Sequence, residues 1–308
     1  MRLTDNSGKF LATALAGAAL AAAIVTTVPA FAAEPDWNQV GQALGKSGAV
    51  QAGGVYRVGF PRTDLNVTLD RVTLKPGFAL GGWVAFQPMG TDAMVMGDLV
   101  VTQDEVNPVM RKLEEGGIAV TALHNHLLRA EPMTLYMHIE AHGDPAKLAG
   151  AIHAALAASK TPFSPPPGTA TPNGMDMIGI DRVMGYTGQD SGGVYQFGIP
   201  RAQPVTERGM ALPGPMGAAN AINFQQTGFS TAAVTGDFIL AADEVTPVIK
   251  ALQAHGIEVT ALHSHMLSEQ PRMFFLHFWA NDDALKLATG LRAALDHVDV
   301  KKDTAKAK

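Results

Sequence analysis

The chain has 308 residues, a formal net charge of −5 at pH 7 and no cysteine. This mild acidity, without a basic patch, argues against nucleic acid as a partner. The absence of cysteine excludes disulfides, thiolate metal sites and a lipid-modified cysteine anchor. With 47% hydrophobic residues, a chain of this length can bury the cores of two ordinary domains.

The first 33 residues are predicted to be a secretory signal peptide. Arg2 and Lys9 form a basic start, residues 11–25 form a short apolar run, and the letters AFA at positions 30–32 provide a small-residue cleavage site. The apolar run is shorter than a membrane-spanning helix requires. We therefore expect an exported, periplasmic protein that keeps no stable membrane anchor after cleavage.

The rest of the chain contains an internal duplication. The letters GGVYRVGFPR at 53–62 return as GGVYQFGIPR at 192–201, an offset of 139 residues, and residues 97–126 share 16 of 30 positions with residues 236–265. A duplicated domain explains this similarity better than chance does. The predicted organisation is a first repeat domain at 34–160, a Pro-rich linker at 161–177, a second repeat domain at 178–298 and a disordered tail at 299–308.

The elements of the first repeat can be read in chain order. Capping residues, turn residues and apolar periodicity predict helices at 37–45, from 104 to about 115 and from 144 onward, and strands at 50–60, 66–74, 79–86, 94–102, 118–126 and 133–140. Runs of antiparallel strands interrupted by a few helices are typical of an α+β fold. We predict two homologous domains, each a mainly antiparallel sheet with two or three helices, related by a pseudo-twofold axis.

A repeated histidine motif carries the chemistry. The letters TALHNH at 121–126 return as TALHSH at 260–265, and a further histidine, His138 or His277, follows each motif after eleven intervening residues. Side chains two residues apart on a strand share a face, so each His-x-His pair can point both imidazoles the same way. Six of the ten histidines thus form two equivalent trios: His124, His126 and His138, and His263, His265 and His277.

Strand pairing is expected to bring each trio together. We predict that Ile118, Val120, Ala122, His124 and His126 share one face of their strand. With Glu131 at the centre of the hairpin, His124 would lie opposite His138, and His126 opposite Tyr136. Three imidazoles could then bind one metal ion at roughly 2.0–2.1 Å from each nitrogen.

Further ligands are available near each trio. His142, Glu131 or Asp144 could add a fourth ligand in the first repeat, and Glu131 is also a candidate catalytic base. In the second repeat Glu269 is the corresponding carboxylate, and Asn281 replaces His142. Imidazole and carboxylate without thiolate favour a divalent metal, with zinc first and copper, nickel or iron as alternatives.

Other interpretations of these motifs remain open. The histidines could form a structural hydrogen-bonded cluster. The letters HNH alone do not predict a nuclease, and a cupin-like His-x-His-Glu pattern conflicts with the helix that precedes each motif. Arg62 and Arg201, which end equivalent strands, are expected to pair with Asp98 and Asp237, or to bind a ligand carboxylate.

The motifs resemble those of the LppY/LpqO family, an exported bacterial domain of unknown function. The similar segments are MGD at 96–98, DEVNPVM at 104–110, TALHNHL at 121–127 and HGDP at 142–145, with VYR and FPRTDL upstream. Some members of that family are lipoproteins, whereas this chain lacks the cysteine for a lipid anchor. The resemblance implies export and a tandem domain, and it implies no particular activity.

Three functions are therefore open. The first is a metal-dependent hydrolase or related small-molecule enzyme that uses His124, His126 and His138. The second is a non-catalytic protein that binds a metal or small-molecule ligand between the two domains. The third is an envelope interaction protein whose histidines are structural.

Overall fold

The computed structural model describes residue 1, residues 35–164 and residues 173–302. Apart from Met1, the predicted signal peptide lies outside this part of the chain, as do residues 165–172 of the predicted linker and residues 303–308 of the predicted tail.

The first repeat forms one six-stranded antiparallel sheet in the order β1-β2-β5-β6-β8-β7. Its sheet strands are β1 (Ala49–Val50), β2 (Tyr56–Pro61), β5 (Gly81–Met89), β6 (Asp92–Thr102), β7 (Ala119–His124) and β8 (Thr134–Gly143). A separate small hairpin contains β3 (Thr68–Leu69) and β4 (Val72–Thr73). The helical segments are α1 (Trp37–Leu44), η1 (Ala52–Gly54), α2 (Pro76–Ala79), α3 (Val106–Glu115) and α4 (Pro145–Leu156).

The second repeat has the same arrangement, with the sheet order β15-β16-β14-β13-β10-β9. Its sheet strands are β9 (Gln189–Ser191), β10 (Val194–Pro200), β13 (Ala219–Gln226), β14 (Thr231–Leu240), β15 (Glu258–His263) and β16 (Phe274–Asp283), and its small hairpin contains β11 (Thr206–Glu207) and β12 (Met210–Ala211). Its helical segments are α5 (Met177–Met184), η2 (Gly214–Met216), α6 (Ala242–Ala254) and α7 (Ala284–Leu295). The predicted α+β fold with two homologous domains is therefore confirmed.

Helix caps recur at equivalent positions and explain where the helices begin. The carboxylate of Asp36 accepts a hydrogen bond from the main-chain nitrogen of Asn38 at the start of α1. Asp144 caps α4 in the same way, and Asp283 caps α7. A capping carboxylate satisfies main-chain donors that have no partner inside the helix and interacts favourably with the helix dipole.

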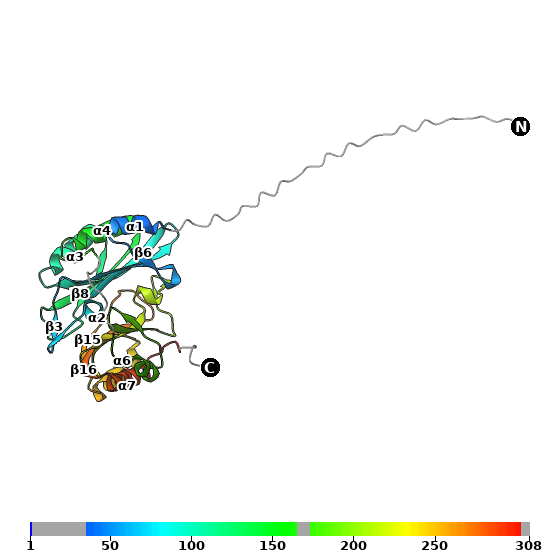
Figure 1. Cartoon of the computed structure of the whole chain (residues 1–308). Helices are drawn as coiled ribbons and strands as arrows, with labels where there is room; N and C mark the ends of the chain where they lie inside the picture. Colours follow the sequence, from blue (N-terminus) through cyan, green and yellow to red (C-terminus); the bar gives the residue numbers. More distant parts are fainter. Residues whose placement is uncertain (2–34, 165–172, 303–308) are drawn as a thin grey trace. The chain divides into compact units, whose positions relative to one another are not determined.

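One face of each sheet is covered by that repeat's own helices. In the first repeat α1, α3 and α4 lie together over the sheet, and in the second α6 and α7 do so (Figure 1). The apolar sides of these helices and strands form one core per repeat, which includes Val58, Phe86 and Ile152 in the first and Phe224, Phe278 and Leu291 in the second. Burying these side chains is the main stabilising contribution to each repeat.

The other face of each sheet packs against the small hairpin of the other repeat. Leu69 and Val72, on β3 and β4, pack in one apolar cluster with Trp279 of the second sheet. In the reciprocal cluster, Leu212 after β12 packs with Met94 of the first sheet. The prediction of one continuous strand at 66–74 is wrong, because positive φ angles at Asp70 and Arg71 turn the chain into a hairpin there.

The predicted ion pairs of the two repeated arginines are also wrong. Arg62 is fully buried and pairs with Glu105 at 2.7 Å and Asp64 at 2.8 Å, and Arg201 pairs with Glu244 at 2.6 Å. Each glutamate lies at the start of the helix that follows the central strand, where a carboxylate also accepts main-chain hydrogen bonds. This arrangement leaves the expected partners, Asp98 and Asp237, free for another role.

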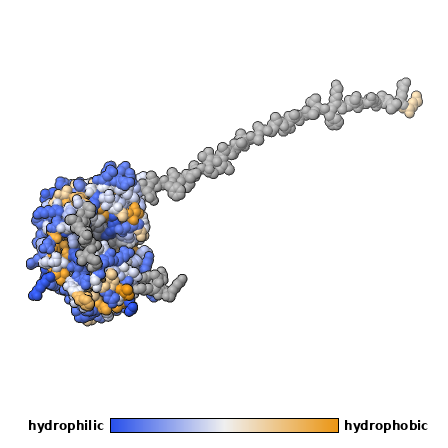
Figure 2. Space-filling model, in the orientation of Figure 1, coloured by the Kyte–Doolittle hydropathy of each residue, from blue (hydrophilic) through white to orange (hydrophobic). Residues whose placement is uncertain are grey.

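The chain beyond the last helix continues along the second repeat. Val300 forms a bridge with Arg201, and the main-chain nitrogen of Lys301 donates to the carbonyl of Pro200 at 2.9 Å. On the face of the molecule shown in Figure 2, hydrophobic residues lie scattered among hydrophilic ones, as is usual for a folded domain. No helix in the described part of the chain has the length and apolar character needed to cross a membrane.

Candidate metal centre

The histidine strands pair in a register different from the predicted one. Across β7 and β8, Ala122 lies opposite His138 and His124 lies opposite Tyr136. Across β15 and β16, Ala261 lies opposite His277 and His263 opposite Phe275. The pairing is shifted by two residues relative to the prediction, so the histidines still share one face of the sheet.

A β-bulge in each edge strand decides which face that is. The register changes between Val120 and Ala122, with Thr121 as the extra residue, and it changes in the same way between Val259 and Ala261. Before the first bulge Val120 lies opposite Ile139 and packs in the core beneath the helices. The prediction that Val120 shares a face with His124 is therefore wrong, because a bulge re-aims the side chains that follow it.

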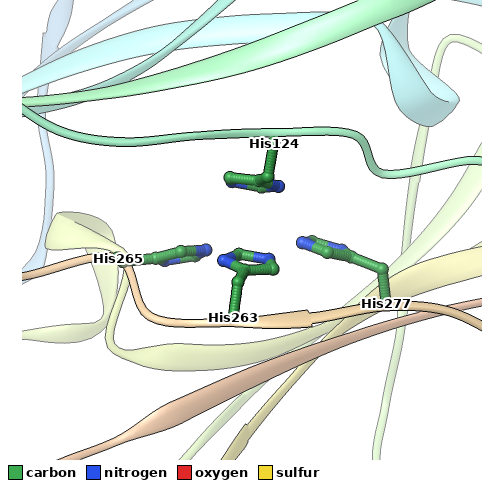
Figure 3. Close-up of side chains that lie close together, drawn as sticks. All are labelled: His124, His263, His265 and His277. Atoms are coloured by element: carbon green, nitrogen blue, oxygen red, sulfur yellow. The ribbon is translucent and has the colours of Figure 1, made fainter.

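After the bulges, the histidines point toward the other repeat, and the two trios meet. The ring nitrogens of His124, His126 and His138 lie within 4.8 Å of one another, and those of His263, His265 and His277 form a second such group together with His124. In Figure 3 the three rings of the second trio lie at one level, with the ring of His124 above them. The repeats thus form one centre of six histidines between them, whereas the sequence predicted two separate sites.

Each ring of one trio stacks on a ring of the other. The ring centroids are 3.5 Å apart for His124 and His263, 3.8 Å for His126 and His277, and 3.7 Å for His138 and His265. The outer faces are closed by aromatic rings at equivalent positions, Tyr136 against His126 at 3.3 Å and Phe275 against His265 at 3.5 Å. A pseudo-twofold axis through the His124–His263 stack relates the two repeats. It therefore relates the His126–His277 contact to the His265–His138 contact, and Tyr136 to Phe275.

Hydrogen bonds at Nδ1 fix the tautomer of three of these rings. Nδ1 of His124 lies 3.1 Å from the carbonyl oxygen of Asn125, that of His277 lies 2.8 Å from the carbonyl of Gly236, and that of His263 lies 3.4 Å from the carbonyl of Ser264. A carbonyl oxygen only accepts hydrogen bonds, so Nδ1 donates and Nε2 carries the lone pair. Metal-binding histidines are commonly oriented in this way.

All six Nε2 atoms are buried and have no hydrogen-bond partner in the described part of the chain. Buried polar atoms are nearly always paired, because an unpaired one costs about 1–3 kcal/mol. A structural cluster of hydrogen-bonded histidines would satisfy these atoms with one another, and they are not so arranged. The arrangement can instead satisfy them with a cation.

Burial keeps the imidazoles neutral. It lowers the pKa of His124 to about 4 and that of His263 to about 3, in the second case together with the repulsion from His124. The pKa values of the other four histidines are lowered well below the ordinary value, first by burial and then by the neighbouring imidazoles. A neutral imidazole is the form that binds a metal ion.

Two aspartates at equivalent positions border the rings; Asp98 is buried and Asp237 is partly buried. Carboxylate oxygens of Asp98 lie 3.8 Å from Nε2 of His126 and 3.7 Å from Nε2 of His138, and Asp237 lies 3.7 Å from Nε2 of His265. Oδ1 of each aspartate has no hydrogen-bond partner in the described part of the chain. Burial raises the pKa of Asp98 to about 7, against the attraction of Arg57, and raises that of Asp237 well above its usual range.

These aspartates were not among the predicted ligands, although a signal for them exists in the sequence. The pair Gly-Asp occurs at 97–98 and again at 236–237, at the same offset as the histidines. In the sheets Asp98 lies opposite His138, and Asp237 lies opposite His277. A repeated carboxylate on the strand next to a repeated histidine is therefore a useful indicator of a shared site.

The remaining predicted ligands belong to neither histidine group. His142 is exposed, 3.9 Å from Glu140. Glu131 is also exposed, and its main chain exchanges hydrogen bonds with Thr68. Asp144 caps α4, and Glu269 accepts hydrogen bonds from Arg272 and from the main chain of Met273.

The fold and the centre together define a tandem α+β protein with a histidine-rich centre between its two repeats. Sequence comparison assigns this chain to a family: residues 38–158 and 179–297 each match the Domain of Unknown Function (DUF1259), and the chain belongs to that family. The two matches correspond to the two repeats. No curated protein sequence is significantly similar to this chain.

Two solved structures show a distant likeness. A trimeric bacterial microcompartment shell protein, PduB, shares 13% identity with a TM-score of 0.21, over 83% of this chain and 96% of that one. EtuB from Clostridium kluyveri shares 11% identity with a TM-score of 0.19, over 80% of this chain and 90% of that one. Similarity at this level supports no conclusion about this chain.

Proposed function

We propose that this protein binds a divalent transition metal through the histidine centre between its repeats. The observation that supports this most directly is the set of six buried Nε2 atoms that have no hydrogen-bond partner among the described residues, on histidines that form two groups with ring nitrogens within 4.8 Å of one another. Nitrogens bound to one ion at roughly 2.0–2.1 Å lie about 3.3–3.6 Å apart, so small ring movements would suffice for binding.

The donor set favours certain metals. Neutral imidazoles with nearby carboxylates and no thiolate suit zinc first, and also copper, nickel or iron, whereas magnesium and calcium prefer oxygen ligands. The ligands in this proposal are His124, His126 and His138 of the first repeat and His263, His265 and His277 of the second. His142 and Glu131 are not part of it.

The enclosure of the centre favours metal binding over turnover of a large substrate. A cavity of about 10 Å³ adjoins His138 and His265, and this is room for about one water molecule. The hydrolase hypothesis also needs a base at the metal, and the predicted base Glu131 has an exposed side chain.

We also propose that the protein is exported to the periplasm and that its tandem domains are of the LppY/LpqO type. The layout of residues 1–33 supports export, and the repeated motifs support the family resemblance. N-terminal sequencing of protein from the periplasmic fraction tests export. We expect the mature chain to begin at Ala33 or Glu34, and an intact Met1 in that fraction would contradict the proposal.

Elemental analysis of the mature protein, purified without a histidine tag, tests metal binding. We expect at least one zinc, copper, nickel or iron ion per chain, and a large loss of metal in a His124→Ala/His126→Ala variant. A His255→Ala/His297→Ala variant is the matched control, because these histidines lie outside both groups and removing them changes the histidine count equally. The absence of metal from the wild-type protein, even after reloading, would exclude the proposal.

A further inference from the structure

We infer that the centre holds two metal ions per chain, one in each histidine trio, stacked across the pseudo-twofold axis. The inference rests on the proposed metal binding and adds the number of ions, their arrangement and two carboxylate ligands. It follows from the orientation of the six rings.

The rings lie in two parallel layers. His124, His126 and His138 each stack on a different ring of the other trio, with centroid distances between 3.5 and 3.8 Å. Each ring of the first trio therefore lies at about the same height above the second trio, and the three rings of the first trio share one layer. Within the first layer the plane of His124 is inclined by 8° to that of His138 and by 27° to that of His126.

Each layer is close to the dimensions of a three-histidine metal site. The centroid of His124 lies 5.1 Å from that of His126 and 5.0 Å from that of His138. In the second layer the centroid of His263 lies 4.9 Å from that of His265 and 5.0 Å from that of His277, whereas His265 and His277 are 6.4 Å apart. Three imidazoles bound to one ion at about 2.0–2.1 Å have centroids roughly 5–5.5 Å apart, so the outer ring of the second layer would move inward by about 1 Å on binding.

A single ion bound by His124 and the second trio is the main alternative, because these four residues also form a group. The lone pair of an imidazole lies in the plane of its ring. To bind an ion in the second layer from above, the ring of His124 would have to stand nearly perpendicular to that layer. Its plane is instead inclined by only 24° to that of His263 and 16° to that of His277 (Figure 3), so its lone pair points within its own layer.

The spacing and the charges suit two ions. Ions at the centres of layers that are 3.5–3.8 Å apart would be separated by a distance typical of two-metal sites, about 3.5–4 Å. Their mutual repulsion requires negative charge nearby. Asp98 lies beside His126 and His138, and the partly buried Asp237 lies beside His265, so each layer has one carboxylate within 4 Å of an imidazole nitrogen.

Zinc titration of the metal-free protein, followed by native mass spectrometry, tests the number of ions. We expect two zinc ions per wild-type chain, one in His126→Ala/His138→Ala and one in His265→Ala/His277→Ala. These two variants are matched, since each removes the equivalent pair from one layer, and circular dichroism checks that each is folded. The His255→Ala/His297→Ala control should bind two ions.

Copper(II) loading of the wild-type protein gives a test that needs no variant. Two copper ions roughly 4 Å apart should couple magnetically, which produces a half-field electron paramagnetic resonance signal or loss of the ordinary signal. One ion per chain with an uncoupled copper spectrum would overturn the two-ion inference and leave metal binding intact. No bound metal at all would overturn the proposed function itself.

Discussion

The hydroxyl of Thr121 donates a 2.6 Å hydrogen bond to the main-chain carbonyl of His265 in the other repeat. The equivalent Thr260 donates to the carbonyl of His126 at 2.5 Å. Both threonines are the extra residues of the two β-bulges. Each bulge therefore turns the histidines of its own strand toward the centre and also forms a hydrogen bond to the main chain of a histidine in the other repeat. The two repeats are thereby linked at the histidine centre itself.

Replacing these threonines should destabilise the protein and weaken metal binding. Thr121→Val keeps the shape of the side chain and leaves the carbonyl of the buried His265 without its donor, so we expect a loss of about 1–3 kcal/mol in unfolding free energy. Urea unfolding and a zinc titration measure the two effects. Thr289→Val, at an exposed position on α7, is the control and should change stability by less than about 0.5 kcal/mol.

Breaking the buried ion pair of either repeated arginine should be costly. Arg62→Met leaves the carboxylate of Glu105 buried without its partner, and we expect a loss of about 3–5 kcal/mol. Arg201→Met should have a similar effect on the second repeat through Glu244. Lys112→Met removes an exposed pair with Glu115 and should cost less than about 1 kcal/mol in the same unfolding measurement.

The same glutamates should make stability depend on pH in the acid range. Burial raises the pKa of Glu105 and Glu244, but the hydrogen bonds from the arginines and from main-chain nitrogens outweigh burial and lower it. The resulting stabilisation is present above the unfolded-state pKa of about 4.3 and is lost as the pH falls through the lower pKa of the folded state. Thermal melting of the wild type and of Glu105→Gln/Glu244→Gln should therefore differ most at neutral pH and converge toward pH 3. A constant difference would contradict this assignment.

Gly236 should not tolerate a side chain. A Cβ atom there would collide with the main-chain oxygen of Ala221, and the carbonyl of Gly236 accepts from Nδ1 of His277. We expect Gly236→Ala to cost at least about 1–3 kcal/mol in stability and to reduce metal content. Gly150→Ala, in α4 with no atom within 4 Å of the added Cβ, should instead stabilise the protein by up to about 1 kcal/mol.

Two residues predicted as functional from sequence should prove dispensable for the metal. His142→Ala and Glu131→Gln alter exposed side chains outside both histidine groups, so elemental analysis should find the wild-type metal content in each. His138→Ala, on the same strand as His142, should lose metal. Loss of metal from His142→Ala would mean that the centre extends along β8.

Removing the metal should lower thermal stability. An ion that binds only the folded state stabilises it by about 2.7 kcal/mol when its free concentration is 100 times its Kd. Melting with and without a chelator measures this difference, and added zinc should restore it. The His126→Ala/His265→Ala variant, with one ligand removed from each trio, should show a much smaller response to the chelator.

Local sequence patterns were sufficient to predict several features of the fold and the site. The duplication, the α+β class and the three-residue sets of histidines all follow from short-range regularities: the 139-residue offset, the alternation of strands and the His-x-His spacing. The helix start at Asp144 could be predicted for the same reason, since a cap depends on neighbours three residues away.

Other features depended on contacts far apart in sequence. The predicted pairing of Arg62 with Asp98 failed because the arginine fits a buried helix start 43 residues away, with Glu105. The prediction of one strand at 66–74 failed because this segment forms a hairpin that packs onto the other repeat. A pattern of alternating residues does not distinguish a strand in a sheet from an arm that packs on a neighbouring domain.

The sequence by itself determined that there are two copies of one domain and that each carries three histidines on adjoining strands. Only the tertiary structure decided that the six rings face one another, with Asp98 and Asp237 beside them. The physical reason is the bulge at Thr121 and at Thr260: one extra residue reverses the face to which a strand's side chains point. Which face is buried against the other repeat is settled by the packing of the two sheets and their exchanged hairpins.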